Sequence, residues 1–123
     1  MSDEIVLRLP RERPFFGVAH LVLGGLAVRL DLSFDQLEDV QVALGELLER
    51  HDAADHDVTL SVTVEGDVIR ASIGPFDDTL AADLERDGDS VGLRRVLDTV
   101  VDSVELTQRD GRPWVRLTKT VAR

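Results

Sequence analysis

The most constraining feature of the sequence is a strict alternation of apolar and hydroxyl-bearing residues between Val58 and Val64. Valine or leucine occupies every second position, and threonine or serine occupies the positions between them. Successive side chains of a strand point to opposite faces of a sheet, so this pattern predicts a strand with one buried face. The turn residues Glu65-Gly66-Asp67 and the following segment 68–73 predict a hairpin. A chain with this hairpin must form a sheet and cover one face of it.

The clearest helix begins at Ser33. Ser33 and Gln36 have the spacing of a capping box, in which each side chain bonds to the backbone of the other residue. Between Leu37 and His51 apolar residues recur at steps of three and four, which predicts one buried stripe along the helix.

The remaining segments complete the order of elements. A helix is expected from about Phe15 to Leu30, and because apolar residues occupy most of its faces we expect it to be largely buried. The other expected elements are a strand at 5–9, a loop at 74–90, a helix at 91–101 and a hairpin of strands at 104–107 and 114–121. The prediction is an α/β (α+β) two-layer sandwich, with a mostly antiparallel mixed sheet covered on one face by three helices. Residues 1–123 are expected to form a single domain.

Composition excludes several classes of function. The chain has 24 acidic and 14 basic residues, a formal charge of −10, which argues against nucleic acid and anionic membranes as partners. It has no cysteine, so disulfides, zinc–cysteine sites and cysteine nucleophiles are ruled out. No signal peptide or membrane-spanning segment is recognisable, so we expect a cytoplasmic location.

The order of elements and the segment Gly92–Leu106, GLRRVLDTVVDSVEL, resemble a known family. The segment is similar to that family's glycine-leucine helix start, which leads through a valine-aspartate pair into the next strand. The family is that of the anti-sigma regulatory factors that act as serine-protein kinases, with the histidine-kinase-like (GHKL) ATPase fold. The helix that begins at Ser33 is similar to the family helix that carries the first ATP-site motif. The resemblance implies this fold, a homodimer and a protein partner.

Two motifs of the family's ATP site are altered. The first motif places a glutamate, used as general base, four residues before an asparagine that holds magnesium. Glu46 matches the glutamate, but Arg50 occupies the asparagine position. A guanidinium has only donors and cannot ligate Mg²⁺, which requires oxygen ligands. In the Asp-x-Gly-x-Gly motif Ser72 replaces the aspartate that accepts from adenine, Gly74 is kept, and the second glycine is absent.

The third ATP-site feature of the family is a glycine-rich lid over the phosphates. Gly88 and Gly92 are retained, but residues 77–90 contain six acidic side chains and one arginine. A net charge of −5 repels a triphosphate. We therefore expect a degenerate nucleotide site, with no cofactor and no metal. The alternative is an active kinase with ATP and Mg²⁺, in which Glu46 is the base and Arg50 binds phosphate. Glu46 is otherwise a solvated carboxylate, and Arg50 can pair with it at a spacing of four residues.

The expected function follows from the resemblance and its departures. We expect a regulatory binding protein that contacts a sigma factor or a STAS-domain antagonist. The homodimer interface is expected near the first strand and first helix. His20 follows Ala19 at the position where related anti-sigma factors have an arginine that helps to hold the sigma factor, so His20 is the candidate partner contact. A histidine bordering a buried helix, and a domain used only for dimerisation or scaffolding, are the alternatives.

Two further patterns are interpreted as structural. His51 and His56 flank two aspartates, but their spacing of five does not align them on one helical face, so a polar helix end is expected. Trp114 is expected to pack against the core or a sheet edge.

Overall fold

One antiparallel sheet organises the part of the chain that the computed structural model describes, residues 3–10, 12–30, 33–50, 57–85 and 92–120. Its strands are β1 (Asp3–Leu9), β2 (Val58–Glu65), β3 (Val68–Gly74), β4 (Ser103–Arg109) and β5 (Arg112–Thr120). Their order across the sheet is β1-β2-β3-β5-β4. Every neighbouring pair is antiparallel, so the expected sheet is confirmed without a parallel component among these strands.

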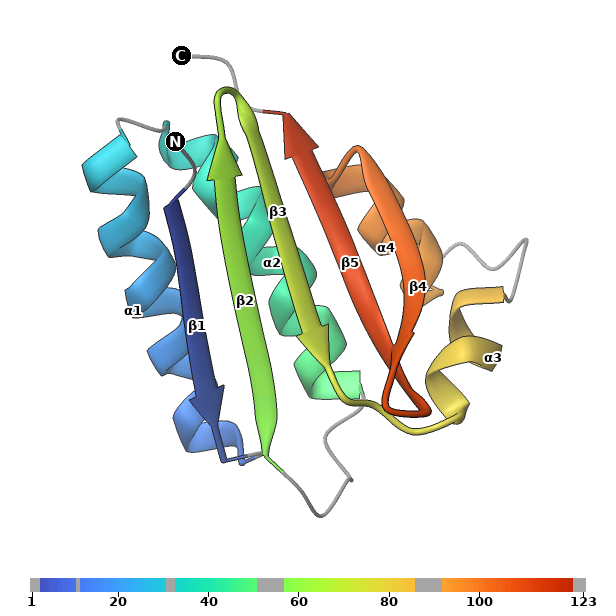
Figure 1. Ribbon diagram of the computed structural model, residues 1–123. Helices are drawn as coiled ribbons and strands as arrows, with labels where there is room; N and C mark the ends of the chain where they lie inside the picture. The colour runs from blue at the N-terminus through green and yellow to red at the C-terminus, as the bar shows by residue number, and fades with distance from the viewer. Residues whose placement is uncertain (1–2, 11, 31–32, 51–56, 86–91, 121–123) are drawn as a thin grey trace.

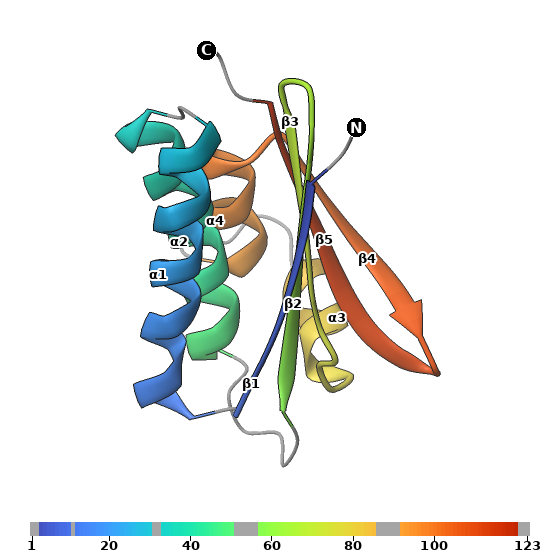
Figure 2. The same cartoon turned by 60° about the vertical axis from the view of Figure 1, so that its left-hand side comes forward.

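Helices cover one face of this sheet. They are α1 (Arg13–Leu30), α2 (Phe34–Arg50), α3 (Thr79–Glu85) and α4 (Leu93–Val100). α1, α2 and α4 form the second layer, whereas α3 lies near the turn between β4 and β5 (Figures 1 and 2). The predicted two-layer sandwich with three covering helices is therefore confirmed, and α3 is an addition to it.

The buried residues of β2 and α2 pack together in one hydrophobic core. The valines and leucines of β2 are buried and its hydroxyl-bearing residues are not, as the alternation predicts. On α2, Leu44, Leu47 and Leu48 are each at most 1% exposed. Lys119 of β5 joins the layers, because its Nζ donates to Asp39 of α2 and to the carbonyl of Val100, each at 3.1 Å.

Local signals fix the ends of several elements. The Ser33 amide donates to Gln36 Oε1 at 3.1 Å, and the Gln36 amide donates to Ser33 Oγ at 3.2 Å, so the predicted capping box is confirmed. Gly66 closes the first hairpin with φ 57°, and Asp110-Gly111 closes the second with φ 54° and 76°. These left-handed conformations explain the glycines in both turns.

The prediction of a loop over 74–90 is wrong for residues 79–85, which form α3. The Asp77 carboxylate accepts from the Thr79 amide at 3.1 Å, which starts the helix. Leu80 and Leu84, four residues apart, are 0% and 5% exposed. Their burial anchors the helix, and it outweighs the acidic character of the segment. Residues 86–91 lie outside the described part of the chain.

The expectation that α1 is largely buried is also wrong. Its inward stripe is buried, but Leu21 and Val28 are 77% and 84% exposed. The helix stands at the end of the helix layer, where it packs against α2 on one side and near β1 (Figure 2). None of the described helices and strands covers its outward face. Among the described residues, no helix combines the length and the apolar character needed to cross a membrane.

Candidate functional site

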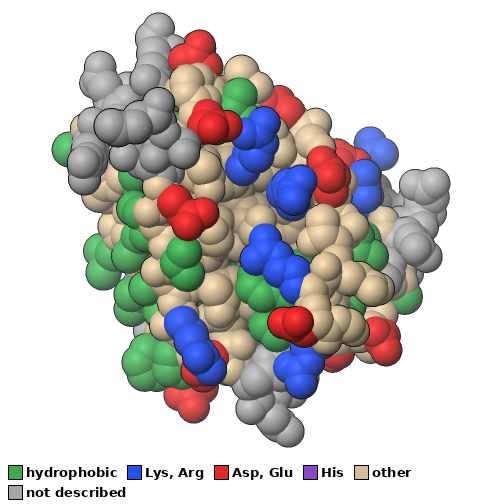
Figure 3. Space-filling model, in the orientation of Figure 1, with side chains coloured by type: hydrophobic (Ala, Val, Ile, Leu, Met, Phe, Trp, Pro, Cys, Tyr) green, Lys and Arg blue, Asp and Glu red, His purple; other side chains and the backbone are tan. Residues whose placement is uncertain are grey.

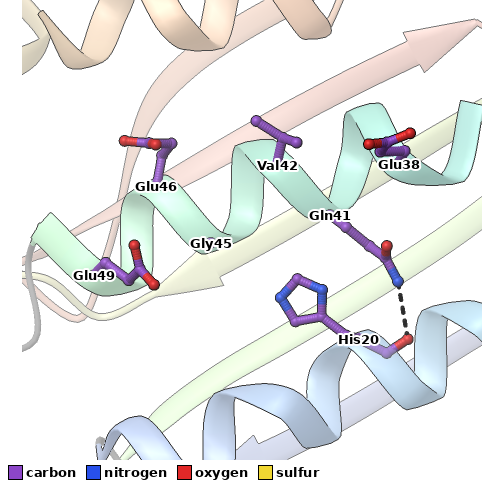
Figure 4. Close-up of a pocket in the computed structure, with 7 residues that line it drawn as sticks. All are labelled: His20, Glu38, Gln41, Val42, Gly45, Glu46 and Glu49. Carbon is purple, nitrogen blue, oxygen red and sulfur yellow. Dashed lines mark hydrogen bonds between the residues drawn. The ribbon is translucent and has the colours of Figure 1, made fainter. Parts of the chain in front are cut away.

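A groove of about 310 Å³ runs between α1 and α2 on the outside of the helix layer. One side chain comes from α1 and the other lining residues come from α2 (Figure 4). The lining residues are His20, Glu38, Gln41, Val42, Gly45, Glu46 and Glu49. Two predicted site residues, His20 and Glu46, therefore face the same open space, although 26 positions separate them in the sequence.

Close contact between the two helices fixes the position of His20. Gln41 donates from Nε2 to the carbonyl oxygen of His20 at 3.2 Å, which ties the helices together at this point. A Cβ atom on Gly45 would lie 4.0 Å from His20 Nε2, so the imidazole lies beside the glycine. The polar imidazole thus forms one wall of the groove.

α2 supplies the charge of the groove. Glu38, Val42, Gly45 and Glu49 follow one another at steps of four, three and four, which places them in one line along the helix. The lining contains three glutamates and no lysine or arginine. Of the groove residues that α2 supplies, only Glu46 was predicted as a site residue. The same periodicity that identified the buried stripe of α2, applied to its opposite face, would have found the others.

At the end of β3, where the resemblance places the adenine motif, Gly74 lies against Trp114 of β5 on the same face of the sheet as Ser72. A Cβ atom on Gly74 would lie 2.6 Å from Cδ2 and 2.7 Å from Cγ of Trp114. The indole is 9% exposed, which confirms the prediction that it packs, and the Arg109 guanidinium carbon lies 4.4 Å from its ring centre. Glycine is required at position 74 by this close approach. The sequence carried no signal for that contact, because the two residues are 40 positions apart.

Ser72 lies on the face of the sheet away from the main helix layer. Side chains alternate along β3, and Ile69, Ala71 and Ile73 are the buried ones. Ser72 stands beside Arg116 of β5 on the opposite face. The residue that faces the helices at this point of the strand is Ile73, which is 1% exposed and apolar. Neither Ile73 nor Gly74 has a side chain that could accept from an adenine amino group.

The remaining predicted residues lie elsewhere or outside the description. Gly92 is buried and precedes α4 with φ −65°, so the predicted glycine-leucine helix start is confirmed. Arg50 ends α2, but its side chain is not among those described, and Gly88 falls in the segment 86–91. The predicted pairing of Arg50 with Glu46 therefore stays a prediction. His51 and His56 also lie outside the described residues.

The uncovered face of the sheet is a second polar surface (Figure 3). Two of its arginines have acidic partners: Arg70 lies 3.3 Å from Glu65, and Arg116 lies 3.9 Å from Glu105. At the edge strand, Arg8 lies 3.0 Å from Asp57. Exposed pairs of this kind contribute little to stability, about 0 to 1 kcal/mol each. This surface has the balanced charge of a solvated face.

Comparison with known proteins finds weak but consistent similarity to one group of proteins. The serine-protein kinase RsbW of Halalkalibacterium halodurans is 28% identical over 130 aligned positions, which cover 89% of this chain and 78% of the relative. RsbW of Listeria monocytogenes is 26% identical, covering 90% of this chain and 83% of the relative. This chain is a distant homologue of the RsbW serine-protein kinases. No protein-family model matches it.

Solved structures with the same fold as this chain include an RsbW domain. A structure of the RsbU and RsbW domains of a Mycobacterium tuberculosis protein superposes with a TM-score of 0.74 at 15% identity. The match covers 98% of this chain and 32% of that one. A structure of the SiaB-SiaC complex from Pseudomonas aeruginosa superposes with a TM-score of 0.57 at 15% identity, covering 96% and 89% of the two chains. The predicted α+β fold is therefore confirmed as one shared with an RsbW domain.

Proposed function

We propose that this protein is an anti-sigma-type regulator that acts by binding a protein partner and has lost ATP binding and kinase activity. The partner is a sigma factor or a STAS-domain antagonist. One observation carries the proposal: the chain keeps an RsbW-type fold, while the strand end that resembles the adenine motif presents the apolar Ile73, and not a carboxylate, to the helix layer. The fold is retained and the chemistry of the nucleotide site is replaced.

The residues at the metal position support this proposal. Mg²⁺ requires hard oxygen ligands in near-octahedral geometry, usually carboxylates, phosphates and water. The position that the resemblance assigns to the magnesium-binding asparagine is Arg50. An arginine is always charged and offers no lone pair, so it would repel the ion. Glu46, the matching general base, is half-buried and lines the groove from the side of α2 away from His20 (Figure 4).

The residues at the adenine position support it as well. A carboxylate that accepts from the adenine amino group would form a charge-assisted bond, and neither Ser72 nor Ile73 can provide one. Ser72 lies on the opposite face of the sheet from α2 and α4. The described acidic residues Asp77, Asp78 and Asp83 precede or belong to α3 and bring no positive charge for phosphates.

Calorimetry with ATP and MgCl₂ tests the loss of nucleotide binding. We expect no heat of binding, with the Listeria monocytogenes RsbW relative measured in parallel to show that the conditions suit this fold. A dissociation constant in the micromolar range, about −8 kcal/mol, would instead support an ATP-dependent serine kinase with an altered site. In that case Glu46→Gln should abolish phosphate transfer and leave nucleotide binding intact.

Co-purification from the native host tests the partner. Tagged protein should retain a sigma factor or a STAS-domain protein, identified by mass spectrometry. Retention of neither class, with a folded and dimeric protein, would support the alternative of a scaffold used only for self-association.

The exposed face of α1 supports a homodimer. Leu21 and Val28 are seven residues apart, on one side of the helix, and more than three quarters exposed. Gly17 and Gly24 belong to the same line, and a Cβ atom on either would meet nothing within 4 Å. Alternating small and large apolar residues suit close packing against the same face of a second copy. Sedimentation equilibrium should give twice the mass of the chain.

A further inference from the structure

The groove between α1 and α2 differs from every other charged surface described above. It is concave, it is acidic, and an apolar side chain lies at its centre: Val42 is 39% exposed between Glu38 and Glu49 (Figure 4). Gly45 follows Val42 on the same line and leaves room where a side chain would stand. The result is an apolar gap with a carboxylate at each end.

The carboxylates at the two ends, Glu38 and Glu49, have no ionic partner among the described residues. Within the described residues, neither Glu38 nor Glu49 forms a hydrogen bond or an ion pair. On the uncovered face of the sheet, by contrast, Arg70 and Arg116 each have a glutamate within 4 Å. Glu46 and Glu49, three residues apart, also repel one another slightly within the helix. The charges of Glu38 and Glu49 are thus left without a partner in the part of the chain that the structure describes.

The spacing of the two carboxylates defines what fits between them. Glu38 and Glu49 are eleven residues apart, or about 16 Å along a helix that rises 1.5 Å per residue. A second helix can carry two cationic side chains at the same separation, with aliphatic side chains between them on the same face. Those aliphatic side chains would contact Val42 and fill the gap over Gly45. His20 would border the docked helix from the α1 side.

We propose that this groove binds an amphipathic basic helix of the protein partner, with arginine or lysine at each end and an aliphatic centre. The inference rests on the proposed function, since it names the chemistry of the partner surface that the regulator recognises. The end charges steer the helix and set its register, and the apolar centre excludes water from the contact.

A designed peptide tests the groove directly. The probe is an alanine-based helix with two arginines at the separation of Glu38 and Glu49 and two leucines between them. Its control has glutamine in place of both arginines. In NMR titrations of ¹⁵N-labelled protein, the arginine peptide should shift the amides of Val42, Gly45 and His20, and the glutamine peptide should bind about tenfold more weakly. Shifts that MgCl₂ or spermine reproduces at the same residues would overturn the proposal in favour of a simple cation site.

Two charge-matched variants show whether the effect belongs to the groove. Glu38→Gln/Glu49→Gln removes two negative charges from its ends. Asp78→Asn/Glu105→Gln removes two charges from exposed positions on other parts of the surface. The first variant should lose about tenfold in peptide affinity and the second should match the parent chain. Equal losses of affinity in both variants would mean that peptide binding depends only on the net charge of the protein, which would overturn the proposal.

The natural partner separates this inference from the proposed function. If the chain retains a sigma factor or STAS protein and Glu38→Gln/Glu49→Gln retains it equally well, the groove proposal fails and the proposed function stands. If no such protein is retained by the parent chain, the proposed function fails, and the peptide titration still decides what the groove binds.

Discussion

α1 and α2 lie side by side in the helix layer and have nearly the same length, but their outer faces are of opposite kinds. α2 turns Leu44, Leu47 and Leu48 inward and glutamates outward. α1 turns a similar stripe inward, yet exposes Leu21 and Val28. The inward faces are what a two-layer sandwich requires. The apolar outward face of α1 is not required by the fold of one chain, and it is the surface that we propose for the homodimer.

The comparison also separates two kinds of surface that the proposed regulator would use. A face of apolar and small residues has no charge to set its register, and it suits a permanent contact with a second copy. A groove with apolar centre and charged ends suits a contact that forms and dissociates, because end charges raise the association rate. The two surfaces adjoin at His20, which stands one residue before Leu21.

The largest expected difference in stability is between substitutions of a buried leucine of α2 and of an exposed leucine of α1. Leu47→Ala, at a side chain that is 0% exposed, should lower the free energy of unfolding by about 2 to 5 kcal/mol, because it removes buried contacts and leaves a cavity. Leu21→Ala deletes the same atoms at a 77% exposed site and should change the free energy of unfolding by less than about 0.5 kcal/mol. Urea denaturation at protein concentrations that favour the monomer measures both. Similar losses in the two variants would contradict the exposed position of Leu21.

Two glycine substitutions compare a crowded position at the end of β3 with an open position on α1. Gly74→Ala should destabilise the chain by about 1 to 3 kcal/mol, because the new Cβ would overlap the indole of Trp114. Gly24→Ala should stabilise the monomer by up to about 1 kcal/mol, since alanine favours a helix and nothing lies within 4 Å.

A double-mutant cycle checks the cause assigned to Gly74. Trp114→Leu should relieve part of the penalty of Gly74→Ala, so that the two changes are less than additive. Strict additivity would mean that the penalty arises from the backbone of β3 and not from the indole.

Much of the fold could be predicted because its signals are local. The period of β2, the turn glycines and the capping box each involve residues within a few positions of one another. α3 was missed although Asp77, Leu80 and Leu84 have the spacing of a capped helix, because the acidic composition of the segment favoured a loop. The exposure of α1 was missed because the sequence pattern of an apolar helix is the same whether its outer face is buried or exposed.

The candidate site was less predictable for a physical reason. His20 and Glu46 come to one groove through the way α1 packs on α2, and Trp114 reaches Gly74 through strand pairing. Both depend on tertiary contacts between distant positions. The sequence identified the positions that differ from the ATP motifs of the family it resembles, but not the tertiary contacts that those positions make.

The capping box offers a smaller and more local test of α2. Ser33→Ala removes the acceptor for the Gln36 amide and should cost about 1 kcal/mol, because that backbone donor then has only water as a partner. Thermal unfolding followed by circular dichroism measures the change. Ser33→Asp restores an acceptor and should recover most of the stability. A full loss in Ser33→Asp would show that the hydroxyl has another role.

The smallest change in stability should accompany the clearest change in assembly. Leu21→Gln/Val28→Gln replaces two side chains that are 77% and 84% exposed, so the monomer should keep its free energy of unfolding within about 0.5 kcal/mol. The proposed dimer buries the same side chains, and two glutamines there would leave polar groups without partners at the interface. Sedimentation should therefore show monomer where the parent chain is dimeric. Glu38→Gln/Glu49→Gln should stay dimeric, because its changes lie in the groove. If both variants dissociate, the outer faces of α1 and α2 form one continuous interface, and the distinction between a permanent and an exchanging surface does not hold.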